Sequence, residues 1–229
     1  MSEYYKKKSF NEFFNEISPR LGVRKISFKK IFDYLDKLPD PITIVETGCL
    51  RIKDNFEGDG QSTLLFDVYT QFRGNNSKVY TVDINPQATK NCSQVVSKNV
   101  HIETGDSVQY LNRLAKIFVD KKITPSMFYL DSFDLNWRSP EESGQHHLKE
   151  LVSIKSILNL DTLVVVDDSP ISGYLQESEL KKGNLDFIPF GLVPKPTIAG
   201  KGYLIHQYAM QTGAKLLFSN YQTAWTGFN

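Results

Sequence analysis

The chain has 229 residues, enough for one substantial domain with a sizeable core. Its 27 lysines and arginines against 26 aspartates and glutamates leave a formal net charge of +1, which argues against a dedicated nucleic-acid or membrane binder. The two cysteines, Cys49 and Cys92, are too few for a disulfide framework and lack metal-site spacing, so they favour a reducing compartment. The sequence shows neither an apolar signal core nor a membrane-spanning run, and we expect a soluble, cytoplasmic protein.

Two short helices are expected before the first strand. Ser9 and Glu12 fit a capping box, and aromatic residues follow at one-face helical spacing. A second apolar stripe runs over 28–38, and Pro39 and Pro41 end it. We expect residues 1–40 to form an N-terminal helical cap.

From Pro41 onward, strand and helix patterns alternate. Such alternation predicts right-handed crossovers and an α/β fold with a doubly wound, mostly parallel, Rossmann-like sheet. The runs "VYTVDI" and "TLVVVDD" are nearly continuous in apolar residues, as is typical of strands covered on both faces. The expected elements are strands at 42–47, 79–83, 99–103, 126–131 and 162–167, and helices at 61–72, 86–96, 106–118 and 141–158.

The last part of the chain has a weaker pattern. Glycine and proline recur at irregular intervals after Pro170, which is typical of a mobile, substrate-facing segment. A helix at 202–212 and a strand at 214–219 are expected to close the fold. We therefore predict one domain over 1–229, with a ligand-binding core at 41–168 and a substrate-facing part at 169–229.

The stretch "VETGCLRIKDNFEGDGQST" joins the first strand to the next helix. The strand ends at Glu46, the loop contains Gly48 and Gly60, and Ser62 or Thr63 is available as the helix cap. This strand, glycine loop and helix unit is a usual small-ligand site in parallel sheets. A dinucleotide site would need a compact glycine fingerprint, and Glu46 would repel phosphates. The loop instead suits a ligand with positive charge, such as S-adenosylmethionine.

Other strand ends also carry acids. Asp83 ends the second strand roughly twenty positions after Gly60, where an acid accepts hydrogen bonds from ribose hydroxyls. The alternative is that it caps the turn before Pro86. Asp106, in "TGDS", either caps its own helix or contacts an adenine amino group.

Together these motifs resemble class I S-adenosylmethionine-dependent methyltransferases over residues 42–168. "VETGCLR…GDGQST" resembles the first motif with an enlarged loop, "VYTVDI" the ribose acid, "TGDS" the adenine segment and "FYLDSFD" the end of the fourth strand. The resemblance implies methyl transfer from S-adenosylmethionine. The expected cofactor-binding residues are Glu46, Gly48, Gly60, Ser62, Thr63, Asp83, Ile84, Asp106, Ser107 and Asp131.

Within that family, "LDSFD" with the later "HHLKEL" and "VVVDDSP" is similar to metal-dependent sugar O-methyltransferases of the macrocin type and their cephalosporin-hydroxylase-like relatives. This implies a small-molecule or sugar hydroxyl as acceptor, and Asp131, Asp167 and Asp168 as ligands of Mg²⁺. Three neighbouring carboxylates would indeed repel one another without a cation between them. Because adjacent residues on a strand point to opposite faces, Asp167 and Asp168 can share an ion only if the strand has already turned. Loop capping by these acids is the alternative.

The catalytic base has three candidates. Such enzymes often have a histidine just after the fourth-strand acid, but this chain has Asp134, and its histidines follow at His146 and His147. Helical spacing places His147 on the inward stripe, near a reacting hydroxyl. A purely structural histidine is the alternative.

Two aspects of the chain stay open at this stage. Trp137, Tyr221 and Trp225 are expected either to form a flat platform for the acceptor or to pack in the core. A nicotinamide-dependent oxidoreductase and a noncatalytic nucleoside-binding module are the rival functions. We expect no nucleic-acid or membrane partner, and leave open a homo-oligomer.

Overall fold

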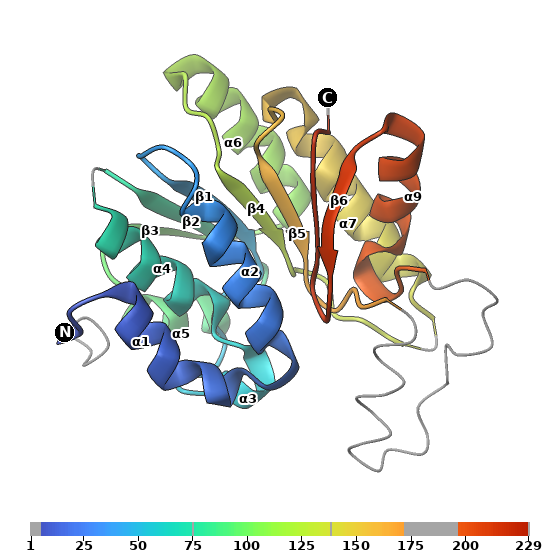
Figure 1. Cartoon of the computed structure of the whole chain (residues 1–229). Coiled ribbons are helices and arrows are strands. Elements are labelled where there is room, and N and C mark those ends of the chain that lie inside the picture. Colours follow the sequence, from blue (N-terminus) through green and yellow to red (C-terminus); the bar gives the residue numbers. More distant parts are fainter. Residues whose placement is uncertain (1–5, 75, 138, 172–196, 229) are drawn as a thin grey trace, which may run out of the picture.

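A computed structural model describes residues 6–74, 76–137, 139–171 and 197–228 (Figure 1). The chain begins with α1 (Phe10–Ile17), the 3₁₀ segment η2 (Ser18–Arg24) and α2 (Lys25–Leu35). The Ser9 hydroxyl accepts a hydrogen bond from the Glu12 backbone N–H at 3.1 Å, so the predicted cap of the first helix is confirmed. The helical cap lies against one face of the sheet.

The predicted alternation of strands and helices is confirmed, with ends shifted by a few residues. A short helix, α3, was not predicted. The elements that follow α2 are β1 (Thr43–Thr47), α3 (Phe56–Asp59), α4 (Ser62–Arg73), β2 (Lys78–Asp83), α5 (Pro86–Val95), β3 (Val100–Thr104), α6 (Ser107–Lys121), β4 (Met127–Leu130), α7 (Glu141–Ile154), η3 (Lys155–Ile157), β5 (Leu163–Val166), η5 (Gly200–Gly202), α9 (Tyr203–Thr212), β6 (Lys215–Ser219) and β7 (Thr223–Thr226).

The described strands form one seven-stranded sheet in the order β3-β2-β1-β4-β5-β7-β6. Neighbours from β3 to β5 pair in parallel, whereas β7 is antiparallel to both β5 and β6. The strand order reverses between β1 and β4, and the loops after these two strands leave toward opposite faces. A crevice for a ligand forms at such a point.

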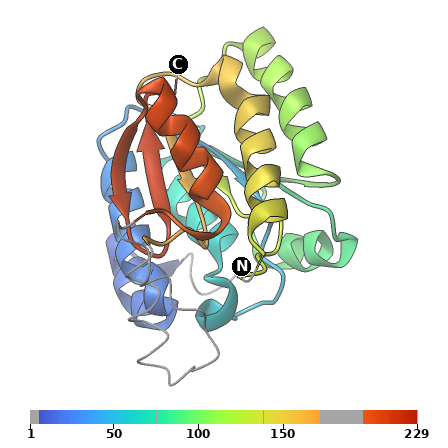
Figure 2. The same ribbon diagram turned by 90° about the vertical axis from the view of Figure 1, so that its right-hand side faces the viewer.

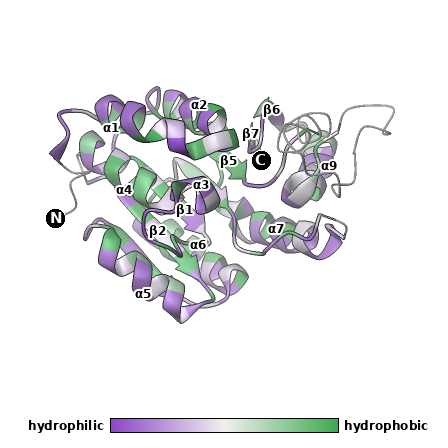
Figure 3. Ribbon diagram, turned by 90° about the horizontal axis from the view of Figure 1, so that it is seen from below, coloured by the Kyte–Doolittle hydropathy of each residue, from purple (hydrophilic) through white to green (hydrophobic). Residues whose placement is uncertain are grey.

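Both faces of the sheet are covered by helices. One core cluster joins α1, α2, α4 and α5 to the sheet, with the rings of Phe28 and Tyr129 stacked at 6.0 Å. The other contains Leu111 of α6, Leu151 of α7 and Ile205 of α9. Figure 2 shows α6, α7 and α9 side by side on this second face, and Figure 3 shows that the helices carry both hydrophobic and hydrophilic residues. Amphipathic helices on two faces explain the continuous apolar strands.

The expected mobile segment after Pro170 lies mostly outside the described residues. On its two described flanks, Ile171 and Ile198 form an isolated antiparallel bridge. Among the described helices, none is long and apolar enough to cross a membrane.

Strand β7 was not predicted, and the sequence analysis left two alternatives for its Trp225, an acceptor platform or the core. Trp225 is fully buried in β7, opposite Val164 of β5, so the core alternative is correct for this residue. Trp137 and Tyr221 instead lie near the carboxyl ends of the central strands: Trp137 beside Gly200, and Tyr221 beneath the guanidinium of Arg24.

We predict that Trp225→Ala lowers the free energy of unfolding by about 3–5 kcal/mol, because it leaves a large cavity between β5 and α9. Urea unfolding measures this. Met210→Ala, at a residue 64 % exposed on α9, is the control and should change stability by less than about 0.5 kcal/mol. A loss below 1 kcal/mol at Trp225, estimated on the same scale, would contradict the packing described.

Candidate functional site

The turn after β1 requires glycine at position 48. Gly48 has φ +79°, and its N–H donates to the Val82 carbonyl at 2.8 Å. A Cβ on this residue would overlap the carbonyl oxygen of Asp131 and lie 2.9 Å from its carbonyl carbon. Glycine therefore allows the end of β1 to approach the end of β4.

Asp83, at the end of β2, is held by two backbone amides. Its Oδ2 accepts from the Cys49 N–H at 3.1 Å, and its Oδ1 accepts from the Asn85 N–H at 2.8 Å. The turn-capping interpretation is thus confirmed. It does not exclude the ribose interpretation, because Asp83 also lines the neighbouring cavities and each carboxylate oxygen has a further lone pair.

Two adjoining cavities open at the carboxyl ends of β1 and β2 and share Gly48, Asp83, Ile84 and Ser132. The larger has a volume of about 220 Å³ and the smaller about 60 Å³. Of the expected cofactor set, Ser62 and Asp131 line the larger and Asp106 and Ser107 the smaller. A cavity of about 560 Å³ lies at the opposite, amino ends of the strands, where no site was predicted.

Asp106 fulfils one of its two predicted roles. It is the N-cap of α6, and its Oδ1 accepts from the Gln109 N–H at 2.9 Å. Its place on the smaller cavity leaves the adenine contact as a prediction.

Three of the expected cofactor-binding residues support the loop after β1 from inside the fold. Glu46 is fully buried, and its Oε2 accepts from the hydroxyls of Thr63 at 2.6 Å and Thr81 at 2.7 Å. The Thr63 hydroxyl also accepts from the Leu50 N–H at 2.9 Å. Gly60 ends α3 with φ +70°. In this conformation Glu46 and Thr63 have no exposed surface for direct cofactor contact, so they shape the loop instead.

The predicted cap of α4 was wrong. Neither Ser62 nor Thr63 is the N-cap: that position is Gln61, with φ 55°, and its side chain does not cap the helix. The Gln61 amide instead donates to the Ile52 carbonyl at 2.8 Å and accepts from the Asp54 N–H at 3.1 Å. The Gln61 side chain is thus hydrogen-bonded within the enlarged loop, and α4 begins without a side-chain cap.

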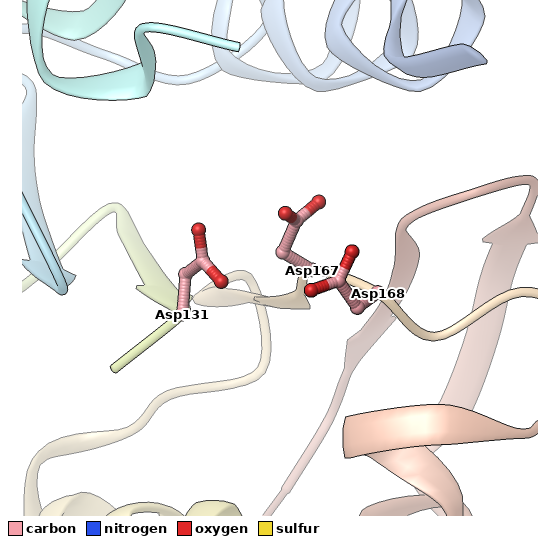
Figure 4. A group of neighbouring side chains, drawn as sticks. All are labelled: Asp131, Asp167 and Asp168. Atoms are coloured by element: carbon pink, nitrogen blue, oxygen red, sulfur yellow. The ribbon is translucent and has the colours of Figure 1, made fainter. Parts of the chain in front are cut away.

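The three acids predicted at the ends of β4 and β5 converge. Strand β5 ends at Val166, and Asp168 has φ 43°, so the chain has turned before the second acid. One carboxylate oxygen from each of Asp131, Asp167 and Asp168 lies within 4.8 Å of the others. Figure 4 shows the three side chains directed toward one space. We call these three residues the carboxylate triad.

Two cations that the sequence analysis missed pair with the carboxylate triad. Arg24 donates to Asp167 Oδ2 at 2.8 Å and to Asp168 Oδ1 at 3.2 Å. Lys201 Nζ contacts Asp131 Oδ1 and lies 3.1 Å from Asp168 Oδ2. Both cations lie outside the regular patterns; glycines on both sides of Lys201 in "AGKG" were the available signal.

Burial acts to raise the pKa values of Asp131 and Asp168, whereas the neighbouring cations act to lower them. Burial alone would raise the pKa of Asp168, but attraction to Lys201 and Arg24 outweighs it and lowers that pKa to about 2. For Asp131, burial dominates and raises the pKa well above its ordinary value, although Lys201 acts against the shift. Attraction to the acids outweighs burial for Lys201 and Arg24, whose pKa values are raised, so both stay charged.

The carboxylate triad does not fit a divalent ion in this conformation. Its donors are all oxygens, which suits Mg²⁺. However, every carboxylate oxygen of the triad except Asp131 Oδ2 already contacts Arg24 or Lys201. The predicted convergence is confirmed, whereas ion binding stays a prediction that requires Lys201 to move.

The three candidate bases lie in different environments. His147 faces inward as predicted, but it is fully buried and its Nδ1–H donates to the Ser143 carbonyl at 2.7 Å. Burial lowers its pKa to about 4. Because it has no exposed surface, it cannot meet an acceptor in this conformation, which favours the structural alternative.

His146 and Asp134 do reach the cavities. His146 lines the smaller cavity, with Nε2 2.9 Å from the Ser107 hydroxyl and 3.5 Å from Glu150 Oε1. Asp134 lines the larger cavity, is largely exposed, and lies 3.2 Å from Arg51 Nη1. The structure therefore brings two of the three candidates to the site.

Comparison with known proteins supports the fold. No protein-family model matches the chain, and no curated protein matches its sequence. A solved S-adenosylmethionine-dependent methyltransferase from Anabaena variabilis has a TM-score of 0.50 and 10 % identity, covering 94 % of this chain and 90 % of that one. A putative rRNA methylase from Clostridium thermocellum has a TM-score of 0.46 and 12 % identity, covering 87 % and 96 %.

The first of these structures matches the fold described above over most of both chains. The chain therefore has the class I methyltransferase fold, as predicted. Membership of the macrocin-type group stays a prediction.

We predict that Gly48→Ala destabilises the protein much more than Gly213→Ala. Both glycines have nearly the same φ, +79° and +78°, but a Cβ at Gly213 meets nothing within 4 Å. The backbone strain should therefore cost about 1 kcal/mol in each variant, with a further 1–3 kcal/mol, estimated from overpacking, at Gly48. Urea unfolding tests this, and equal losses would show that the approach of Gly48 to Asp131 is not a constraint.

A second prediction concerns pH. Burial raises the pKa of Glu46 to about 7 in the folded state, despite the opposing threonine hydrogen bonds. Since an unfolded glutamate titrates near 4.5, the folded state binds the extra proton between these values and loses stability as the pH rises through that window. The free energy of unfolding of Glu46→Gln, relative to the native protein, should thus increase by about 3 kcal/mol from pH 5 to 8.

Urea unfolding at several pH values measures this difference. Glu142→Gln, in the exposed first turn of α7, is the matched control and should show no such trend. A pH-independent difference for Glu46→Gln would mean that Glu46 ionises as it does in the unfolded chain.

Proposed function

We propose that the protein transfers the sulfonium methyl of S-adenosylmethionine to a hydroxyl of a small molecule or sugar. The observation that carries this proposal is Asp83, fixed by two backbone amides at the wall shared by both cavities, directly beyond the Gly48 turn. The class I methyltransferase fold supports it.

The cavity walls suit the two ends of the cofactor. The smaller cavity combines exposed apolar surface on Ile84 and Phe133 with the polar groups of Asp106 and Ser107, as an adenine ring requires. Asp83 lies on the wall shared by the two cavities, where its carboxylate accepts hydrogen bonds from the ribose hydroxyls. The methionine part occupies the larger cavity.

The charge of the larger cavity favours a cationic ligand. Its wall carries four acids and one arginine: Asp59, Asp83, Asp131, Asp134 and Arg51. This surplus of negative charge attracts an ammonium and a sulfonium, whereas it repels a pyrophosphate. The nicotinamide-dependent alternative is correspondingly disfavoured.

The chemistry proposed is an in-line displacement. The protein supplies orientation, because the acceptor oxygen, methyl carbon and sulfur must lie in line at the mouth of the larger cavity. His146 belongs to the adenine end in this arrangement. The proton of the acceptor hydroxyl passes to Asp134, the largely exposed carboxylate on the wall of the larger cavity.

Metal assistance enters this proposal only through the carboxylate triad. Asp131, Asp167 and Asp168 would hold the ion, and when bound it would polarise the acceptor hydroxyl. Because Lys201 and Arg24 already contact the triad, no step above depends on an ion.

The proposal predicts micromolar binding of S-adenosylmethionine and S-adenosylhomocysteine by calorimetry, with no matching NADH binding. Asp83→Ala should weaken binding at least tenfold, since two hydroxyl contacts to a carboxylate are lost. Asp161→Ala, on the cavity at the opposite ends of the strands, should leave it unchanged.

Circular dichroism checks that Asp83→Ala folds. The affinity of Asp83→Asn, which keeps one acceptor oxygen, should fall between that of the native protein and that of Asp83→Ala. Absence of binding by either sulfur compound would contradict the proposal. Binding without turnover on any hydroxyl compound would favour the noncatalytic module.

A further inference from the structure

We propose that Lys201 is a tethered cation that takes the place of a divalent ion at the carboxylate triad. While Lys201 is in place, the triad does not take up Mg²⁺. Arg24 and Lys201 then provide the positive charge beside the carboxylates. This inference concerns ion binding alone and does not rest on the identity of the cofactor.

The position of the ammonium is the first argument. Lys201 is 3 % exposed, and its Nζ bridges Asp131 at the end of β4 and Asp168 beyond β5. A Mg²⁺ ion lies about 2.1 Å from its oxygen ligands. An ion shared by Asp131 and Asp168 would therefore overlap the ammonium, so the two occupants exclude each other.

The backbone around Lys201 is built to hold it there. Gly200 has φ +64°, and a Cβ on it would overlap the Asp168 carbonyl oxygen. The Lys201 N–H donates to that same carbonyl at 3.1 Å. On the other side, a Cβ on Gly202 would lie 2.7 Å from the Ser169 hydroxyl. The Gly-Lys-Gly turn thus lies directly against the chain that follows β5, and the lysine is placed by its backbone.

Charge balance gives the third argument. A divalent ion needs the three carboxylates ionised, and in that state Arg24 and Lys201 together leave a net charge of −1 at the triad. In the same state Arg24 alone leaves −2, which one divalent ion neutralises. An uncharged residue at position 201 should therefore open a divalent-cation site that the native chain keeps closed.

Lys201 also acts as a positioning residue. Asp131 contributes its carbonyl to the close approach of Gly48 and lines the larger cavity. The Lys201 contact orients the Asp131 carboxylate relative to that wall.

The test is a titration with Mn²⁺ followed by the electron paramagnetic resonance of the free ion, repeated with Mg²⁺ by calorimetry. Lys201→Met removes the charge and keeps the chain length, Lys201→Arg keeps a charge, and Lys201→Met combined with Asp167→Asn removes one ligand oxygen. The native protein and Lys201→Arg should show no saturable binding at millimolar ion. Lys201→Met should bind one ion at least tenfold more tightly, and the double variant should lose that gain.

Equal behaviour of the native protein and Lys201→Met overturns the proposal, whether both bind or neither binds. If circular dichroism shows that Lys201→Met does not fold, thermal unfolding of the native protein still tests the proposal. A rise in its thermal unfolding temperature with millimolar Mg²⁺, abolished by Asp167→Asn, contradicts the proposal, and no rise supports it. Titration of the same proteins with S-adenosylmethionine measures cofactor binding separately from ion binding. Failure of the ion-binding proposal is therefore distinct from failure of the methyltransferase proposal.

Discussion

The crowding of three carboxylates, Asp167 buried and Asp131 and Asp168 half-buried, is the constraint on which the site depends. Parallel strands β4 and β5 end at the same edge of the sheet, and an acid directly follows each strand. Such a cluster is stable only if cations accompany it, and removing one partner of a buried pair costs about 3–5 kcal/mol. Arg24 and Lys201 provide the cations from opposite ends of the chain. The helical cap and the segment after β5 are thereby tied to the strand ends.

The same edge of the sheet also forms the two cavities of the candidate site. Gly48 brings the end of β1 against the end of β4, and Asp83 fixes the loop after β1 through the Cys49 amide. The buried Glu46 supports that loop through Thr63. Acids near this crevice therefore have distinct places: Glu46 supports the loop from inside the fold, Asp83 lines both cavities, and the triad is paired with internal cations.

Much of this arrangement could be predicted from the sequence because it follows from periodic patterns. Alternating strands and helices predicted the sheet, and the acids at strand ends predicted which side chains converge. Strand β7 was missed because four residues are too few for a clear alternation, although Ser219 and Asn220 before it are a turn signal. Helical spacing correctly predicted that His147 faces inward, but spacing cannot tell a cavity wall from a closed core.

The partners of the triad could not be predicted in the same way. Arg24 lies 143 residues from Asp167, and Lys201 lies 70 residues from Asp131. Their pairing depends on tertiary packing, which a single sequence does not record. These two side chains decide how much negative charge remains at the ionised triad, and hence how far it resembles a metal centre.

A crystal structure with bound S-adenosylhomocysteine would test the proposed site most directly. We expect ribose hydroxyls on the Asp83 carboxylate, the adenine beside Ile84 and Asp106, and the Lys201 ammonium still between Asp131 and Asp168. A ligand bound elsewhere, or ribose hydroxyls without contact to Asp83, would contradict it.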